Sequence, residues 1–194
     1  MAADAGRPLR ADAQRNREKI LAAAVRLFTE EGLDTHFERI AREAGVGTGT
    51  LYRNFPTREA LIEAAYRNEV ARLCDSAPAL LESMPPLEAL RAWTRRFIDY
   101  ATAKIGMADA MRAVLAAGSD PYADSRTLIQ DALSSLMAAG KAAGAIRSDI
   151  SPGDMFAALA GIALTSAAPE LREQAERLLD LTLDGLRPPP TPLG

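Results

Sequence analysis

Residues 48–54 carry the side chains whose types and spacing are best suited to chemistry. The segment reads Thr-Gly-Thr-Leu-Tyr-Arg-Asn, which brings hydroxyl, guanidinium and amide groups together in one short stretch. Such groups hydrogen-bond to base edges and phosphates, and a small residue lets a backbone approach DNA closely. The residues with no evident role in a core are Thr48, Gly49, Tyr52, Arg53 and Asn54. This pattern favours a DNA-contacting surface over a purely structural helical hairpin.

Two short helices, expected over Phe37–Ala44 and Thr48–Asn54, must position these side chains. Thr35 is the expected N-cap of the first helix, with Glu38 three residues later to complete a capping box. Gly45 suits the left-handed conformation that turns the chain sharply between the two helices. The residues expected to face inward are Phe37, Ile40, Ala41, Ala44, Val46, Leu51 and Phe55.

An earlier helix supplies the surface on which these two helices can be buried. Its apolar residues recur at helical spacing and end at Gly32; they are Ile20, Leu21, Ala24, Leu27 and Phe28. Three helices with a glycine turn between the last two form the helix-turn-helix arrangement.

The rest of the chain is also predicted to be helical, so the expected fold class is all-α. Alanine is abundant, β-branched residues are sparse, and no segment alternates like a strand. Pro56 ends the second short helix, Thr57 caps the next, and Pro78 and Pro85-Pro86 mark later breaks. Helices are expected over 57–77, 86–104, 107–117, 122–143, 153–167 and 169–186.

This pattern divides the chain into four segments. Residues 1–11 are expected to form a flexible arm and residues 12–58 the helix-turn-helix domain. Residues 59–186 form a second helical domain, and residues 187–194 a tail in which consecutive prolines exclude a helix.

Composition limits the classes of function. The net charge is −3, but residues 44–58 contain Arg53 and Arg58 and no acidic residue, so a small basic surface is available to phosphate. No apolar run is long enough for a membrane span, and the first residues lack the apolar stretch of a signal peptide. The lone Cys74 cannot form an intramolecular disulfide. We therefore expect a cytoplasmic protein with no membrane association.

The sequence gives little support for a metal site, a cofactor site or an enzyme active site. His36 is the only histidine, and pairing it with Cys74 would leave zinc short of ligands. The sequence has no glycine-rich phosphate loop, nucleophile elbow or paired Cys/His set. It therefore predicts no cofactor, no metal and no enzyme. A helical enzyme that uses scattered carboxylates and a helical protein-interaction adaptor are the alternatives.

Residues 15–62 combine several short motifs. These are Ile-Leu-x-Ala-Ala and Leu-Phe, a following glycine, Ile-Ala-x-x-Ala-Gly-Val, and Leu-Tyr-x-x-Phe with Glu-Ala-Leu shortly after. Together they resemble the N-terminal signature of the TetR family of transcriptional regulators. The resemblance implies a three-helix DNA-binding domain, followed in residues 59–186 by a helical domain that binds an effector and dimerises.

By position, the resemblance also implies a role for each polar residue of the helix-turn-helix. The residues at DNA-contacting positions are Thr48, Thr50, Tyr52 and Asn54. Those at variable positions that tune sequence preference are Gly47, Gly49 and Arg53. Those expected to meet phosphates are Thr35, His36 and Arg58. His36 replaces the Ser or Thr that is usual in the family.

Three segments of the second helical domain each have two interpretations. The stripes Trp93, Phe97, Tyr100 and Met107, Met111, Leu115 each lie at i, i+4 and about i+7 or i+8, a spacing that alone favours core packing. The resemblance instead implies an effector pocket lined by Trp93, Phe97, Tyr100, Met107 and Met111. Small residues in 156–163 allow close helix approach in a core or in a dimer seam, and the resemblance favours the seam.

With the resemblance, these features predict a homodimeric repressor of transcription. Two recognition helices related by a two-fold axis imply double-stranded operator DNA that is roughly palindromic. An unidentified small-molecule effector is expected to release the DNA by favouring a state that DNA disfavours.

Overall fold

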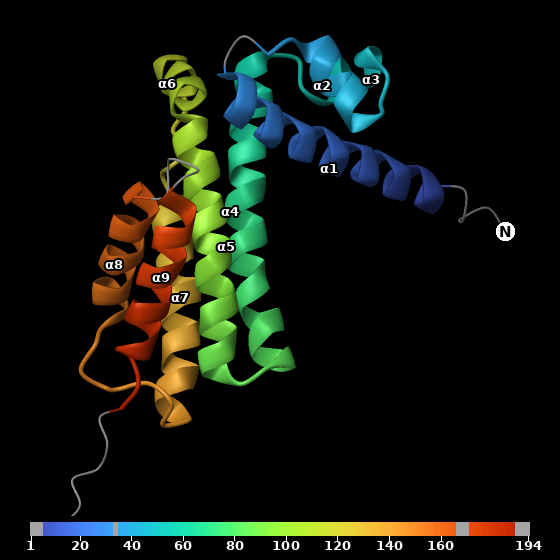
Figure 1. Ribbon diagram of the computed structural model, residues 1–194. Coiled ribbons are helices and arrows are strands. Elements are labelled where there is room, and N and C mark those ends of the chain that lie inside the picture. Colours follow the sequence, from blue (N-terminus) through green and yellow to red (C-terminus); the bar gives the residue numbers. More distant parts are fainter. Residues whose placement is uncertain (1–5, 33–34, 166–170, 189–194) are drawn as a thin grey trace, which may run out of the picture. The chain divides into compact units, whose positions relative to one another are not determined.

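The computed structural model describes residues 6–32, 35–165 and 171–188, with side chains from residue 12 onward (Figure 1). Within these ranges the chain is helical and no strand occurs, which confirms the predicted all-α fold class. The helices are α1 (Gly6–Glu31), α2 (Phe37–Ala44), α3 (Thr48–Asn54), α4 (Arg58–Ser83), α5 (Pro86–Gly106), α6 (Ala108–Ala116), α7 (Ser125–Ala142), α8 (Pro152–Thr165) and α9 (Arg172–Asp184).

The chain forms two compact units, and the division falls within α4 and within α5. The first unit comprises residues 1–68 and 103–121, and the second comprises residues 69–102 and 122–194. This division differs from the boundary expected at residue 58, because α6 and the start of α4 cluster with α1–α3. Gly106 shows how close this packing is: a Cβ added there would lie 2.6 Å from Cγ2 of Thr29 in α1.

The first helix starts earlier than the sequence suggests. α1 begins at Gly6, so residues 6–11 are helical and do not form the expected flexible arm; residues 1–5 lie outside the described ranges. Pro8 is compatible with this start because an amide in the first helical turn has no intrahelical partner to lose. The predicted apolar face is confirmed as buried, in Ile20, Leu21, Ala24, Leu27 and Phe28.

The fourth helix has the predicted start but a later end. The Thr57 side-chain oxygen accepts the backbone N–H of Ala60 at 3.1 Å, which confirms the predicted cap. The expected break at Pro78 is wrong, because α4 continues to Ser83. Ala77 and Leu80 are buried on the same face as Leu73. This burial offsets the roughly 3 kcal/mol that a proline costs within a helix.

The remaining helices differ from expectation mainly at their ends. α7 begins at Ser125 and not at residue 122, because residues 121–124 form a turn. Both the backbone N–H and the hydroxyl of Ser125 donate to the carbonyl oxygen of Tyr122, at 3.1 and 3.0 Å. The expected end of α8 at 167 and start of α9 at 169 lie outside the described residues.

In the second unit, α8 and α9 lie side by side (Figure 1). Their buried residues include Met155, Leu159, Ile162, Ala175, Leu179 and Leu183. Other apolar residues of the pair face solvent: Leu164 is 74% exposed and Leu181 is 70% exposed. Throughout the described residues, every helix is too short or too polar to cross a membrane.

Candidate nucleic-acid interface

The turn between α2 and α3 has the conformation that the sequence predicts. Gly45 has φ 66° and ψ 34°, a left-handed geometry that side chains disfavour. The backbone N–H of Gly45 donates to the carbonyl of Arg42, and that of Val46 to the carbonyl of Ala41, at 3.1 and 3.0 Å. These two bonds close the end of α2 and set the direction in which α3 leaves the turn.

The apolar sides of the two helices are buried as predicted. The buried residues are Phe37, Ile40, Ala41 and Ala44 in α2, Leu51 in α3 and Phe55 directly after it, while Val46 is half-buried. Because Leu51 and Phe55 hold one side of α3 against the first unit, the opposite side of this helix is presented to solvent.

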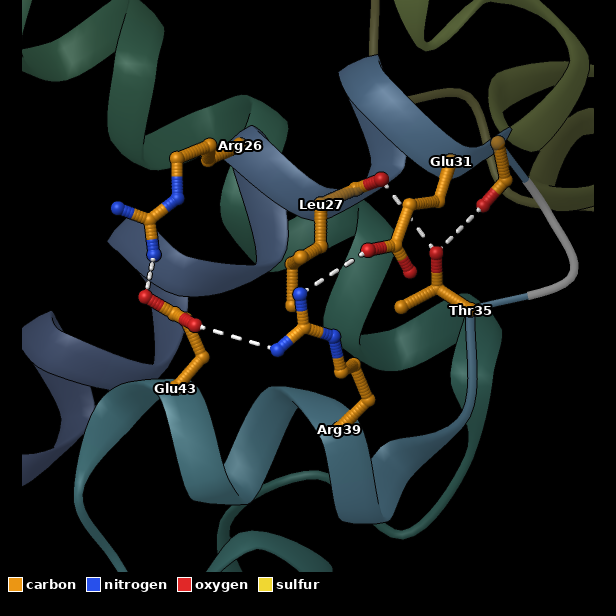
Figure 2. Close-up of polar contacts among 7 residues, drawn as sticks. Arg26, Leu27, Glu31, Thr35, Arg39 and Glu43 are labelled. Atoms are coloured by element: carbon orange, nitrogen blue, oxygen red, sulfur yellow. Dashed lines mark hydrogen bonds and ion pairs between the residues drawn. The ribbon is translucent and has the colours of Figure 1, made fainter.

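Thr35 does not have the role that the sequence suggests. His36 occupies the N-cap of α2, and no side chain caps this helix. The Thr35 hydroxyl instead lies 2.9 Å from the carbonyl oxygen of Gly32 and 3.4 Å from that of Leu27, at the end of α1 (Figure 2). Thr35 is only 2% exposed. Its hydroxyl is therefore engaged inside the protein and does not lie at the surface where a phosphate could reach it.

A chain of ion pairs holds α1 to α2. Arg26 of α1 pairs with Glu43, which lies 3.5 Å from Arg39 on the same face of α2. Arg39 also forms an ion pair with Glu31 of α1, at 3.3 Å (Figure 2). The spacing of Arg39 and Glu43 was visible in the sequence, but their partners on α1 were not. These partly exposed ion pairs add to the apolar packing of α2 against α1, which positions the turn and α3.

The solvent-facing side of α3 carries most of the predicted recognition residues. Gly49, Arg53 and Asn54 are exposed, Thr48 and Thr50 are half-buried, and Tyr52 keeps 48% of its surface exposed. Arg53 donates to the carbonyl of Gly49 and to the hydroxyl of Thr50, each at 3.2 Å, and Asn54 donates to the carbonyl of Thr50 at 2.8 Å. The Arg53 guanidinium and the Asn54 amide therefore have hydrogen-bond partners within α3 itself.

Gly47 and Gly49 lie at exposed positions with open space around them. A Cβ added at either residue would meet no atom within 4 Å, and neither requires a left-handed backbone. Packing within the protein therefore does not require glycine at these positions. Gly47 is the N-cap of α3, a position at which glycine is common, and the small size of both residues leaves the backbone open to approach from outside.

Residues from three helices surround one shallow depression next to α3. It has a volume of about 290 Å³ and is lined by His36, Phe37, Glu38, Tyr52, Pro56 and Arg58. The structure thus brings together His36, Tyr52 and Arg58, which the sequence placed in three separate segments. Glu38 is an unforeseen member: it was expected to cap α2 and instead adds a negative charge at the rim.

The residues predicted to line an effector pocket are divided between the two units. Met107 and Met111 are buried in the first unit, whereas Trp93, Phe97 and Tyr100 are buried in the second. The Phe97 ring lies 5.9 Å from Trp93, 6.0 Å from Tyr100 and 6.0 Å from Phe156, measured between centroids. This mutual packing of rings favours the core interpretation for Trp93 and Phe97.

Cys74, on α4, is half-buried. Burial raises the pKa of its thiol to about 11, and the negative charges of Asp75 and Asp131 add to this effect. The thiol is therefore protonated at neutral pH and is a poor nucleophile.

Comparison with known families matches both parts of the chain. Residues 20–65 match the family of bacterial regulatory proteins called the tetR family. Residues 85–188 match the C-terminal domain of SbtR-like transcriptional regulators. A segment of 54 residues is also 46% identical to an HTH-type transcriptional regulator of Staphylococcus aureus; it covers 27% of this chain and 29% of that protein. The match thus spans less than a third of the relative's length.

Solved structures extend the similarity over nearly the whole chain. The TetR transcriptional regulator SCO0520 from Streptomyces coelicolor is 80% identical with a TM-score of 0.87, over 89% of this chain and 98% of that one. A TetR regulatory protein from Mycobacterium vanbaalenii is 36% identical with a TM-score of 0.77, over 93% and 100%. These relatives are regulators and not enzymes, which sets aside the enzyme alternative. The chain belongs to the TetR family of transcriptional regulators.

Proposed function

We propose that this protein is a homodimeric repressor that binds a palindromic operator and releases it when a small molecule binds residues 59–186. The proposal has three parts: recognition by α3, dimerisation through α8 and α9, and coupling to an effector. Each part is supported by a different observation and is open to a separate test.

The observation that carries the proposal is the outer face of α3. Hydroxyl, guanidinium and amide groups lie there beside two glycines that packing within the protein does not require. In this proposal Thr48, Thr50, Tyr52, Arg53 and Asn54 contact DNA, with Gly47 and Gly49 allowing the backbone to approach. His36 and Arg58, beside the depression next to α3, contact the adjoining phosphates.

Dimerisation is supported by the exposed apolar face of α8 and α9. Leu164 and Leu181 are each more than two-thirds exposed, and Gly161 is exposed with no atom within 4 Å of an added Cβ. Small and apolar residues at such a face suit close helix packing across a two-fold axis. The symmetry of that dimer then requires half-sites in opposite orientation.

Effector release requires that the ligand and the operator favour different states of the dimer. A ligand that bound both states equally would leave the affinity for DNA unchanged. Residues 59–186 are the proposed location because the SbtR-like C-terminal match covers most of them.

The test is selection of bound sequences from random double-stranded DNA by the purified full-length protein. The expected result is an enriched motif with two inverted half-sites, bound by two copies of the chain. Footprinting then locates the same motif near a promoter, and transcription in vitro should fall when the protein is added. Recovery of no motif would overturn the proposal, and so would an enriched motif without inverted symmetry.

A further inference from the structure

A groove of about 690 Å³ lies in the second unit, lined by α4 and α5. Its lining residues are Glu69, Arg72, Leu73, Asp75, Ser76, Arg96, Asp99 and Tyr100. Leu73, Ser76 and Tyr100 are buried, whereas Arg72, Asp75, Arg96 and Asp99 are exposed. The groove therefore has a partly apolar floor and charged walls, unlike the aromatic stripe from which the sequence predicted an apolar effector site.

Most of the charges in the groove are neutralised by neighbours. Arg72 lies 3.4 Å from Glu69 on α4, and Asp99 of α5 pairs with Arg172 of α9 at 2.5 Å. Asp75 and Arg96 are different, because neither forms an ion pair or a side-chain hydrogen bond with any other residue in the described part of the chain. The groove thus keeps one carboxylate on α4 and one guanidinium on α5 available to a ligand.

The spacing of these two charges follows from one hydrogen bond. The indole N–H of Trp93 on α5 donates to the carbonyl oxygen of Leu73 on α4 at 3.0 Å, which fixes the register of the two helices. The helices run antiparallel, so Asp75 and Arg96 lie in opposite directions from this bond. Asp75 is two residues beyond Leu73 and Arg96 is three beyond Trp93, so at 1.5 Å rise per residue their backbones are separated by about 7.5 Å along the helix axes.

We propose that this groove binds a small zwitterion, with its ammonium group beside Asp75, its anionic group beside Arg96 and its carbon chain over Leu73 and Tyr100. The proposal deepens the effector response described above and rests on it. A ligand with a single charge would pair with only one of Asp75 and Arg96 and would leave the other to water. A zwitterion of matching length forms charge-assisted hydrogen bonds at both ends.

Trp93 provides a direct signal for occupation of the groove. It is the only tryptophan of the chain and is fully buried. Its indole is bonded to Leu73, which lines the groove. A ligand that changes the spacing of α4 and α5 alters this hydrogen bond and therefore the emission of the protein.

The experiment titrates the full-length protein, without DNA, with ω-amino acids from glycine to 6-aminohexanoate, followed by calorimetry and Trp93 emission. Affinity is expected to peak at an intermediate length near that of 5-aminopentanoate. Pentanoate and pentylamine, which each carry one of the two charges, should bind about tenfold more weakly. No saturable binding of any member up to about 10 mM would overturn the proposal, and so would binding of pentanoate or pentylamine as tight as that of 5-aminopentanoate.

Matched variants test the two charges separately. Asp75→Asn and Arg96→Gln should each weaken binding of the best ligand by about tenfold without lowering the melting temperature, since both side chains are exposed. Glu82→Gln on α4 and Arg112→Gln on α6 change the same charges outside the groove and should leave binding unchanged. Equal affinity in all four variants would also overturn the proposal.

Operator affinity, measured on the same preparations, separates this proposal from the proposed function. If the protein binds the zwitterion but selects no operator, the groove site is supported and the proposed repressor function is overturned. If the protein selects an operator but binds no zwitterion, the proposed repressor function is supported and the groove site is overturned. Binding of the zwitterion with no change in operator affinity would remove the link between the two.

Discussion

The ring of Tyr52 packs against the ring of Phe37, with centroids 5.1 Å apart and planes inclined by 42°. Phe37 is buried in α2, whereas Tyr52 on α3 is 48% exposed. Within the described residues, the Tyr52 hydroxyl has no hydrogen-bond partner. Tyr52 therefore joins the two helices through its ring and keeps its polar group for another molecule.

Tyr52→Phe should separate these two roles. It preserves the ring contact and removes the hydroxyl, so we expect an unchanged melting temperature and an operator affinity lowered by about tenfold, the value of one hydrogen bond to a charged group. Tyr52→Ala should in addition lose about 1 kcal/mol of stability through the ring contact. Anisotropy of labelled operator and thermal unfolding measure both quantities. Full affinity in Tyr52→Phe would exclude the hydroxyl from the interface.

Arg58→Ala should remove a phosphate contact. Binding to all sequences is then expected to weaken similarly, and the slope of log affinity against log salt should flatten by about one unit. Arg67→Ala, on the same helix, is the control: Arg67 is exposed and pairs with Glu63 at 2.7 Å. If Arg58→Ala instead changes the preferred base and keeps its slope, Arg58 reads sequence and does not anchor the backbone.

Gly49→Ala should change stability and operator affinity in opposite directions. Alanine is favoured over glycine in a helix by up to about 1 kcal/mol, and open space surrounds Gly49, so the melting temperature should rise slightly. Operator affinity should nevertheless fall, because the added methyl group meets DNA. Gly153→Ala is a matched control, since Gly153 is likewise the second residue of its helix, α8. Unchanged affinity in Gly49→Ala would place DNA away from this residue.

Gly161→Leu should affect dimerisation and not stability, whereas Gly140→Ala should affect stability and not dimerisation. A Cβ at Gly161 meets nothing within 4 Å, so leucine there should leave the folded chain intact and disrupt the dimer. A Cβ at Gly140 collides with the Ile146 side chain, so alanine there should cost about 1–3 kcal/mol of stability and spare the dimer interface. Sedimentation velocity and thermal unfolding distinguish these outcomes. A dimer that survives Gly161→Leu would move the interface elsewhere.

Phe97→Ala should behave as a core truncation. Phe97 is 4% exposed and its ring contacts three other aromatic rings, so its loss should cost about 3–5 kcal/mol and lower operator binding in parallel. Melting temperature and operator affinity of the same preparation provide the measurement. A small change in melting temperature, with retained DNA binding and lost effector response, would restore the aromatic stripe as an effector pocket.

Features decided by neighbouring residues were predictable from the sequence. Gly45 ends α2, Thr57 caps α4, and the bounds of α2 and α3 follow from these local signals. The prediction that Thr35 caps α2 is wrong because its hydroxyl bonds to a carbonyl at the end of α1. Only the tertiary structure determines this partner. The predicted break at Pro78 is wrong for a similar reason. Burial of the turn that follows Pro78 outweighs the preference of proline against a helix interior.

Features that join distant segments were beyond sequence reasoning. Nothing in the spacing of Arg26 and Glu43 indicates that they pair. The aromatic stripe of α5 has the same periodicity whether it lines a cavity or fills a core, and only its burial and ring contacts in the structure favour the core. The groove between α4 and α5 depends on the register set by Trp93 and Leu73, which no pattern within one helix reveals.

The ion pairs between α1 and α2 also bear on how the protein finds its target. Arg26 and Arg39 lie beside the helix-turn-helix, but Glu43 and Glu31 already neutralise them, and the whole chain is acidic. We therefore expect Arg26 and Arg39 to contribute little to the affinity for arbitrary DNA, so replacing either one should leave the salt dependence of binding to random sequence nearly unchanged.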